Sequence, residues 1–344
     1  ADRPGAIRAR ITFTREQGMR VSATNGGRLL IESQIVDIEA PEAYDDNPGG
    51  SGPGGKHMKF AGRLEARSLT GSVSADGDAL VVEGADEAVV LFTAKTDYNL
   101  ARLNYDRSLD PAAEAHAILA RVGKKTYRAL RFEHETEHRK VFRRVKIDLG
   151  GEQAFNIPTD ERLNAVKAGG EDPALLAMYF QYGRYLLMSS SRRPGRLPAN
   201  LQGIWNDRMW APWEADYHLN INLQMNYWPA DLCNLSETMD PLVDWFALTT
   251  ERGQVSAKRL FDARGWVVFT CTNPFGRTTP SGSNESSQFQ NGVLDPLAGA
   301  WMAMTLWRHY EFTQDRAFLA DKAYPVLKGA AEFLLDFLVE DGQG

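Results

Sequence analysis

The period of the hydrophobic pattern changes near Asp110, and this change constrains the fold more than any other feature of the sequence. Before it, short runs rich in β-branched or alternating apolar residues are separated by turn-forming clusters. After it, apolar residues recur at helical spacing among charged ones. We therefore predict an all-β part followed by a mainly helical part, and 344 residues leave room for two or three domains.

Residues 1–109 are predicted to form an antiparallel β-sandwich that is incomplete at its N-terminus. The tract DDNPGGSGPGG at 45–55 is interpreted as a solvated hairpin loop or insertion, because no helix start follows it. The strands expected from the pattern are 6–13, 28–38, 59–69 and 88–96.

Residues 110–158 are predicted to be a helical linker, and residues 159–344 a helical domain. The helix expected at 173–191 starts with Asp172 as N-cap and Pro173 at the first helical position. It is apolar around most of its circumference, so we expect it to be buried. Other expected elements are helices at 111–121, 125–145, 236–250, 254–263, 294–313 and 316–339 and a strand at 145–149.

Composition and charge argue against several kinds of partner. A net charge of −6 is unsuited to a nucleic-acid surface, which needs clustered Lys and Arg. No apolar run approaches the roughly 18 residues that span a bilayer, so no membrane partner is expected. The N-terminal ADRPGAIRARITF lacks the apolar stretch of a signal peptide. The two cysteines, Cys233 and Cys271, are too few for a disulfide framework, and we interpret both as buried small side chains.

The sequence HETEH at 134–138 has the H-E-x-x-H form of zinc peptidases. On a helix, His134 and His138 lie one turn apart with Glu135 between them. The flanking residues are charged, as on a solvated helix face, whereas zinc helices bury this turn. An exposed linker helix is therefore favoured, and a zinc peptidase is kept as a remote alternative.

The segment between the helices expected at 173–191 and 236–250 is a loop of more than forty residues, and loops of that length in compact domains are usually functional. Six aromatic residues alternate with seven side-chain amides in it, a composition that can stack against a sugar ring and bond its hydroxyls. The alternative is that the amides only satisfy backbone groups. The aromatic residues are Trp205, Trp210, Trp213, Tyr217, Tyr227 and Trp228, and the amides are Asn200, Gln202, Asn206, Asn220, Asn222, Gln224 and Asn226.

Asn220 and Asn222 are two residues apart, so in an extended segment their side chains point the same way. In that arrangement Leu219 and Ile221 anchor the opposite face. We therefore predict a pair of amides that acts on one ligand.

Long ordered motifs resemble glycoside hydrolase family 95. They are DERLNAVKAGGEDPALLAMYFQYGRYLLMSSSRRPGRLPANLQGIWND, NINLQMNYWPADLCNLSETMDPL, AGAWMAMTLWRHYEFTQD and YPVLKGAAEFLLDFLVED. The resemblance implies an N-terminal β-sandwich, a helical linker, an (α/α)₆ barrel of which 159–344 is the first part, and a C-terminal β domain. It also implies cleavage of terminal α-L-fucosides, typically 1,2-linked, or of α-L-galactosides, with inversion and without metal or cofactor.

By the same resemblance, Asn220 and Asn222 match the asparagine pair that holds the hydrolytic water, polarised by a nearby Asp. His218 matches a residue near C6 of the sugar, where His accompanies the methyl group of fucose and Thr the hydroxymethyl group of galactose. Gln202 and two tryptophans, Trp205 and Trp213, fall in segments that form the pocket wall.

The family's general acid is a Glu in a segment that follows the LVED motif, and 1–344 does not contain it. The water-polarising Asp lies farther downstream in the family. Glu285 and Glu237 are better explained as structural residues, and Asp216 lies in the loop without an assigned catalytic position.

The sequence therefore predicts the N-terminal half of a fucosidase, whose partners are a fucosylated glycan and the remaining C-terminal part of the same protein. The alternatives are an α-L-galactosidase, a non-catalytic carbohydrate-binding fragment and the zinc peptidase. By family resemblance, the expected location is periplasmic or extracellular.

Overall fold

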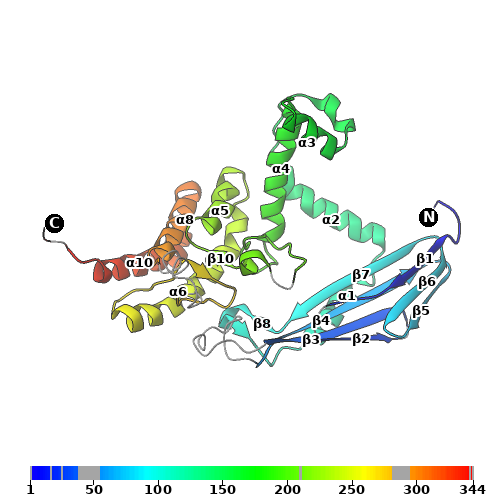
Figure 1. Cartoon of the computed structure of the whole chain (residues 1–344), viewed down its shortest axis with the longest axis horizontal. Coiled ribbons are helices and arrows are strands. Elements are labelled where there is room, and N and C mark those ends of the chain that lie inside the picture. The colour runs from blue at the N-terminus through cyan, green and yellow to red at the C-terminus, as the bar shows by residue number, and fades with distance from the viewer. Residues whose placement is uncertain are drawn as a thin grey trace. The chain divides into compact units, whose positions relative to one another are not determined.

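The computed structural model describes residues 2–15, 18–24, 26–37, 55–208, 211–280, 295–340 and 342. The chain divides into two compact units, Ala1–Thr136 and Glu137–Gly344, and each is described by itself (Figure 1). The first contains antiparallel sheets and the second is mainly helical, as the change of period predicts. Most of the Gly- and Pro-rich tract at 45–55 lies outside the described residues.

Two antiparallel sheets make up most of the first unit, one of four strands in the order β2-β3-β4-β7 and one of three in the order β1-β6-β5 (Figure 1). A short pair, β8-β9, follows. The strands are β1 (Ile7–Ile11), β2 (Met19–Thr24), β3 (Arg28–Asp37), β4 (Gly55–Ser68), β5 (Ser72–Asp76), β6 (Ala79–Ala85), β7 (Ala88–Thr96), β8 (Tyr98–Asn99) and β9 (Asn104–Tyr105). All four expected strands are present, and β2, β5, β6, β8 and β9 are additional ones.

The core of the first unit takes side chains from both sheets. Leu29 on β3 and Leu64 and Ala66 on β4 come from the larger sheet, and Leu80 on β6 from the smaller one. Leu64 and Ala66 are two positions apart and therefore lie on the same face of their strand. The alternation seen in the sequence thus marks the inner face of the sheet.

Helix α1 (Pro111–Val122) packs against β4 and β7 of the larger sheet. Asp110 caps it by accepting from Ala112 N at 2.9 Å, and Pro111 stands at its first turn. Helix α2 (Tyr127–Phe142) follows. The strand expected at 145–149 was a wrong prediction: Val145 O accepts instead from Gln181 Nε2 at 2.8 Å.

The second unit is built from helices joined by irregular segments and one very short strand pair, β10-β11. Its elements are η3 (Glu152–Asn156), α3 (Thr159–Lys167), α4 (Pro173–Ser190), η4 (Pro212–Ala215), β10 (Tyr217–His218), α5 (Asn222–Leu232), η5 (Ser236–Thr238), α6 (Met239–Phe261), β11 (Cys271–Thr272), α8 (Ala298–Thr313), α9 (Arg316–Phe318), the π-helix η6 (Leu319–Ala323) and α10 (Tyr324–Phe337).

Two predictions about these helices were wrong. Helix α5 occupies part of the segment expected to be one long loop, and α6 is one continuous helix where two were expected. Gly253 lies inside α6, and a Cβ there would come within 2.8 Å of Val267 O. The glycine is thus required by close packing of the chain after α6, and it does not end the helix.

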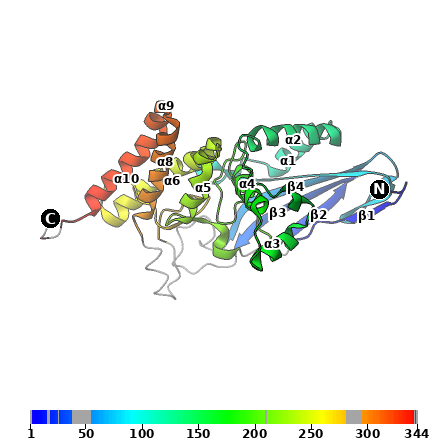
Figure 2. The same ribbon diagram turned by 90° about the horizontal axis from the view of Figure 1, so that it is seen from above.

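The core of the second unit lies between α6, α10 and the segment that leads to β11. Phe333 on α10 packs with Ala257 on α6 and with Val267 and Phe269. Trp245 is fully buried, with its ring centroid 4.5 Å from that of Tyr217. Figures 1 and 2 show α8 and α10 side by side, in agreement with their contacts. This core fixes β10 and the start of α5.

Helix α4 is only partly buried, so the prediction of a buried helix was wrong for the described structure. Leu175 and Leu187 are buried, but Leu176 is 63% exposed and Tyr179 75% exposed. The buried face includes Arg184, which donates to the backbone oxygens of Phe142 and Cys233 at 2.7 and 3.1 Å. None of the described helices is long and apolar enough to cross a lipid bilayer.

Candidate active site

The candidate site is organised by the β10-β11 pair. Tyr217 pairs with Thr272, and His218 with Cys271. The next residue, Leu219, donates from its backbone N to Thr270 O at 2.7 Å and is fully buried. The Tyr217 side chain is also buried, against Trp245, so apolar residues on either side of His218 fix the position of its backbone.

His218 lies against two buried charged residues. Its Nε2 is 2.8 Å from Asp216 Oδ1, and Arg277 Nη2 is 3.4 Å from the other oxygen of Asp216. The side chains of Asp216 and Arg277 are only 8% and 7% exposed. Asp216 Oδ1 has no hydrogen bond of good geometry among the described residues, so its contact with His218 is first of all an ion pair.

The charge of His218 follows from these contacts. Burial lowers its pKa, but the interactions with Asp216 and Cys271 outweigh that effect and raise the pKa to about 10. His218 is therefore a cation at neutral pH, and Asp216 and Arg277 belong to the same charge network.

Trp213 stands beside His218 on a strained segment. Its ring centroid is 6.0 Å from that of His218, nearly perpendicular to it, and 61% of the residue is exposed. Trp213, Glu214 and Ala215 have φ values of 53°, 58° and 48°, in the left-handed region that costs a non-glycine residue about 1 kcal/mol or more. The chain thus adopts a costly conformation where an exposed indole meets the histidine.

The seven amides of this segment divide into two groups. Four of them bond nearby backbone groups, and these are Asn200, Asn206, Gln224 and Asn226. The side chains of Gln202, Asn220 and Asn222 form no hydrogen bond with the described residues. Bonding to backbone groups therefore explains four of the amides. The remaining three are those expected to face a ligand.

Asn220 and Asn222 do not lie on an extended segment, so that prediction was wrong. Asn220 lies in a turn, and Asn222 is the first residue of α5. Ile221 between them is 37% exposed and does not anchor the opposite face, whereas Leu219 does so. Both asparagines are exposed, so their amides can reach a ligand from the turn that follows His218.

Gln202 and Trp205 belong to the segment that precedes Trp213. Leu201 N donates to Asp216 O at 3.3 Å, which links the neighbour of Gln202 to β10. Gln202 Oε1 is buried and without a hydrogen-bond partner among the described residues. Trp205 is 43% exposed and lies against Tyr185 of α4, with centroids 6.3 Å apart. The structure thus brings Gln202, Trp213, His218 and the asparagine pair to one region, with Trp205 at its α4 side.

The other aromatic residues of the segment differ in burial. Tyr227 is 3% exposed and its hydroxyl accepts from Ala199 N at 2.9 Å, so it is a core residue like Tyr217. Trp228 is 53% exposed. Trp210 lies outside the described residues.

The H-E-x-x-H sequence does not form a zinc site with the described residues. It lies on α2, as predicted, but Glu135 pairs with Arg131 at 2.6 Å. His138 stacks on Phe142 with centroids 5.1 Å apart. In the part of the chain that the structure describes, no group of three His, Cys, Asp or Glu side chains could hold a metal ion.

The two carboxylates considered as acid substitutes are not in the site as described. Glu237 pairs with Arg144 at 2.8 Å, which supports a structural role. Glu285 lies outside the described residues.

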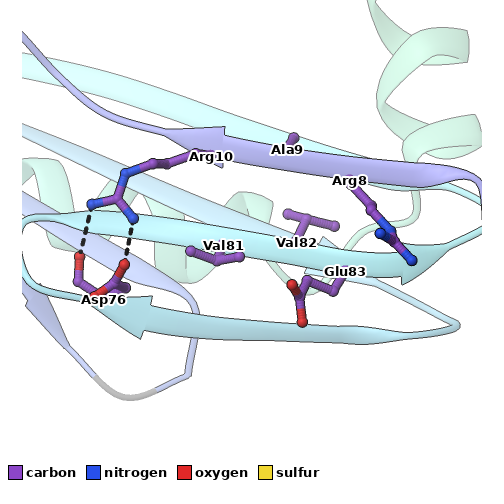
Figure 3. Close-up of a pocket in the computed structure, with 7 residues that line it drawn as sticks. All are labelled: Arg8, Ala9, Arg10, Asp76, Val81, Val82 and Glu83. Carbon is purple, nitrogen blue, oxygen red and sulfur yellow. Dashed lines mark hydrogen bonds and ion pairs between the residues drawn. The ribbon is translucent and has the colours of Figure 1, made fainter.

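A surface pocket of about 410 Å³ lies on the three-stranded sheet of the first unit (Figure 3). Arg10 reaches across it and bonds Asp76. None of the residues that resemble sugar-binding positions lines it. Its lining residues are Arg8, Ala9, Arg10, Asp76, Val81, Val82 and Glu83.

Arg277 and Cys271 were not predicted from the sequence as neighbours of His218, and Asp216 had no predicted role. One signal was present: Asp216 and His218 are two residues apart, so their side chains share a side if the segment is extended. Arg277 and Cys271 come from a segment more than fifty residues away in the sequence, which the β10-β11 pairing brings beside His218.

A solved structure has a fold similar to that of this chain. A structure described as a putative kojibiose phosphorylase from human microbiome matches with a TM-score of 0.53 over 92% of this chain and 36% of that chain. The two are 10% identical, so this likeness concerns the fold alone.

The family follows from the sequence. The model of the glycosyl hydrolase family 95 catalytic domain matches residues 126–344, and the chain belongs to this family. "Alpha-L-fucosidase 2" of Arabidopsis thaliana is 39% identical over 365 residues, which cover 100% of this chain and 41% of that protein. "Probable alpha-fucosidase A" of Aspergillus niger is 36% identical over 269 residues, covering 76% of this chain and 33% of that protein. The chain therefore spans less than half the length of these relatives.

Proposed function

We propose that the whole protein is an inverting α-L-fucosidase that removes terminal, 1,2-linked fucose from glycans, and that this chain supplies one wall of its active site. One observation carries the proposal: Asn220 and Asn222 are exposed, without hydrogen bonds to the described residues, and directly after the charged His218. Membership of family 95 and the relatives named as fucosidases support the same activity.

The proposed reaction assigns the hydrolytic water to the asparagine pair. An amide oxygen accepts a hydrogen bond from water, but it does not take up a proton near neutral pH. A carboxylate must therefore polarise the amide and receive the charge, and a separate carboxylic acid must protonate the leaving oxygen. We assign these two carboxyl groups to parts of the whole protein beyond residues 1–344, since the chain spans 41% of the Arabidopsis relative.

The preference for fucose is assigned to His218. Asp216 and Cys271 are its polar partners, which leaves ring carbons to contact the substrate. Ring carbons suit the methyl group of fucose better than the hydroxymethyl group of galactose. Trp213 and Trp205, both partly exposed, offer flat apolar faces to the sugar ring, and Gln202 offers an amide.

The proposed architecture is a β-sandwich, a helical linker and the first part of an (α/α)₆ barrel. The core shared by the two sheets supports the sandwich. Exposed apolar residues on α4 and α10, such as Tyr179 at 75% and Leu335 at 74%, support further helices packing there. The remaining part of the protein is therefore proposed as the partner of these faces. A periplasmic or extracellular location is proposed from the family alone.

The test replaces Asn222 with Ala in the full-length protein and measures turnover of a 1,2-linked fucoside. Loss of a group that positions the nucleophilic water is expected to lower kcat by about a hundredfold or more. Asn206→Ala is the matched control for disturbance of the segment, because among the described residues that amide bonds the backbone of Arg208, and a loss of kcat in Asn222→Ala beyond that of this control measures the role of Asn222. Unchanged kcat in Asn222→Ala would remove this residue from the mechanism.

The stereochemical outcome and the substrate are measured separately. Proton NMR of the first product distinguishes inversion, which releases β-L-fucose, from retention. Faster cleavage of an α-L-galactoside than of the fucoside would favour the galactosidase alternative. Glycan binding without turnover in the full-length protein would favour a non-catalytic carbohydrate-binding role.

A further inference from the structure

A row of three aromatic side chains connects the candidate site with helix α4. The ring of Trp205 lies against that of Tyr185, with centroids 6.3 Å apart, and Tyr185 stacks on Tyr182, with centroids 5.9 Å apart. Each residue is partly exposed, Trp205 at 43%, Tyr185 at 37% and Tyr182 at 54%. We call these three residues the aromatic row.

The aromatic row begins at the wall of the candidate site. Trp205 N donates to Gln202 O at 3.1 Å, and the neighbouring Leu201 N donates to Asp216 O at 3.3 Å. Backbone hydrogen bonds thus join the first residue of the row to the buried carboxylate residue of the site. The two tyrosines follow on α4, three residues apart and therefore neighbours on the helix surface. The row continues the site along α4.

The indole of Trp205 is held in place by a glycine. Gly203 has a φ of 69°, in the left-handed region that suits glycine, and a Cβ there would lie 2.7 Å from Cζ3 of Trp205. A side chain at position 203 would therefore displace the ring. A fixed aromatic face loses little conformational freedom when a ligand stacks on it, which favours binding.

The polar atoms of the aromatic row are open to a ligand. The hydroxyl groups of Tyr182 and Tyr185 and the indole N–H of Trp205 form no hydrogen bond with the described residues. Buried tyrosines usually pair this group, as the Tyr227 hydroxyl does by accepting from Ala199 N at 2.9 Å. A flat apolar face with a hydrogen-bonding edge matches a sugar ring, which has C–H groups on its faces and hydroxyls at its rim.

The aromatic row differs from the exposed face of α4 that includes Tyr179. Successive residues of an α-helix turn by about 100°, so Tyr185 lies about 120° from Tyr179 around the helix axis. Tyr182 lies between these two directions, but its ring stacks on that of Tyr185. Further helices can therefore cover Tyr179 while the aromatic row stays open.

We propose that the aromatic row binds the sugar residues to which the fucose is attached, so that α4 recognises the leaving part of a fucosylated glycan. This proposal rests on the proposed fucosidase function and defines its substrate class more closely. The preferred substrate carries fucose on an oligosaccharide, because one ligand can then contact both the candidate site and the row that continues it.

The experiment compares two substrates of the full-length protein. 2′-Fucosyllactose carries two sugars beyond fucose, whereas α-L-fucosyl fluoride has no sugar in its leaving group. Tyr182→Ala is expected to lower kcat/KM for 2′-fucosyllactose about three- to tenfold, mainly through a higher KM, as for loss of one aromatic contact. For the fluoride, kcat/KM is expected to stay within about twofold of the wild type.

Two control variants separate the parts of this effect. Tyr182→Phe keeps the flat ring and is expected to recover most of the loss. Tyr324→Ala removes a tyrosine of similar exposure, 58%, from α10, and is expected to change neither substrate. The thermal unfolding midpoint of each variant reports whether the fold is intact. Equal losses for both substrates in Tyr182→Ala, or no loss for either, would overturn the proposal.

A binding measurement makes the test independent of turnover. Lactose contains the two sugars beyond fucose without fucose itself, and saturation-transfer NMR follows its binding to the full-length protein. Binding is expected to be weaker in Tyr182→Ala than in the wild type and Tyr324→Ala. A wild type that cleaves neither fucoside would contradict the proposed function, and the lactose measurement would still test the row. Equal lactose binding in all three proteins would contradict the role of the aromatic row.

Discussion

At the scale of single residues, Asp216 determines what His218 can do. A buried histidine without an acidic partner tends to lose its proton, because burial disfavours the charged form. Asp216 Oδ1, 2.8 Å from Nε2, reverses that tendency. Arg277 in turn holds the carboxylate from its other side. Replacing Asp216 should therefore act on the site through His218, which makes it a positioning residue.

The first prediction concerns the pH dependence of this pair. The pKa of His218 is raised to about 10 in the folded state, above the ordinary value of about 6.5. The stabilisation is therefore complete below the unfolded value and is lost as pH rises from there through about 10. Urea unfolding of the wild type and Asp216→Asn at both ends of this range should show a stability difference that shrinks with rising pH. NMR titration of His218 in Asp216→Asn should give a lower midpoint. An unchanged midpoint would disprove the role of Asp216.

Single side chains also show which residues of the site could be predicted from the sequence. The composition of the segment from Asn200 to Trp228 indicated a sugar-facing loop, but seven amides looked alike in the sequence. Only the structure separates Asn226, which bonds Asn200 O at 3.3 Å, from Asn222, which has no such bond among the described residues. An amide's partner depends on which backbone group lies nearby, and that is a property of the folded chain.

At the scale of elements, the interior glycines of two helices differ in the space around them. Gly253 in α6 faces Val267 O, which would be 2.8 Å from an added Cβ. Gly183 in α4 has nothing within 4 Å of that position. Helix propensity alone predicts that alanine stabilises both helices by about 1 kcal/mol.

The second prediction uses this matched pair. Gly183→Ala is expected to stabilise the chain by up to about 1 kcal/mol, because alanine restricts the unfolded chain and meets no neighbour. Gly253→Ala is expected to destabilise it by about 1 kcal/mol or more, because the methyl group forces backbone apart. Denaturant unfolding of the two variants measures both signs. Stabilisation by Gly253→Ala would mean that the packing of α6 is looser than described.

The elements were predictable where the local signal agreed with the packing. The helix predicted at 111–121 corresponds to α1, where Asp110 caps the start. Strand β7 has the predicted bounds because β-branched and aromatic residues, Val89, Val90, Phe92 and Thr93, lie in its centre. The sequences MRVSAT of β2 and SVSAD of β5 contain few apolar residues, so the pairing of these strands depends on their neighbours. Helix α5 was missed because Pro229 and a run of amides hide its period.

At the scale of the whole molecule, the exposed face of α4 is the main departure from the sequence prediction. Its apolar circumference predicts burial, yet Leu176 and Tyr179 are largely exposed in this chain. Burial depends on everything that packs around a helix, and the chain spans 41% of the Arabidopsis relative. The sequence indicates the need for a covering layer, and it cannot specify that layer from these residues alone.

The third prediction tests this interpretation in two lengths of protein. Tyr179→Ser is expected to change the unfolding free energy of the 344-residue chain by less than about 0.5 kcal/mol. In the full-length protein the same change is expected to cost roughly 2 kcal/mol or more, as for loss of a buried aromatic ring. Leu175→Ala, at a buried position of the same helix, should destabilise both proteins and serves as control. Equal small effects of Tyr179→Ser would mean that this face stays open to solvent.

The division of the amides has a practical meaning for enzyme engineering. Asn200, Asn206, Gln224 and Asn226 support the backbone of the segment, so randomising them is expected to disturb its shape. The side chains at positions 202, 220 and 222 form no hydrogen bond with the described residues. Position 202 is thus the place to begin a library aimed at new sugars, because Asn220 and Asn222 are reserved for the water. The number of amide positions to randomise thus falls from seven to one, which is position 202. Trp213 is the second position of the library.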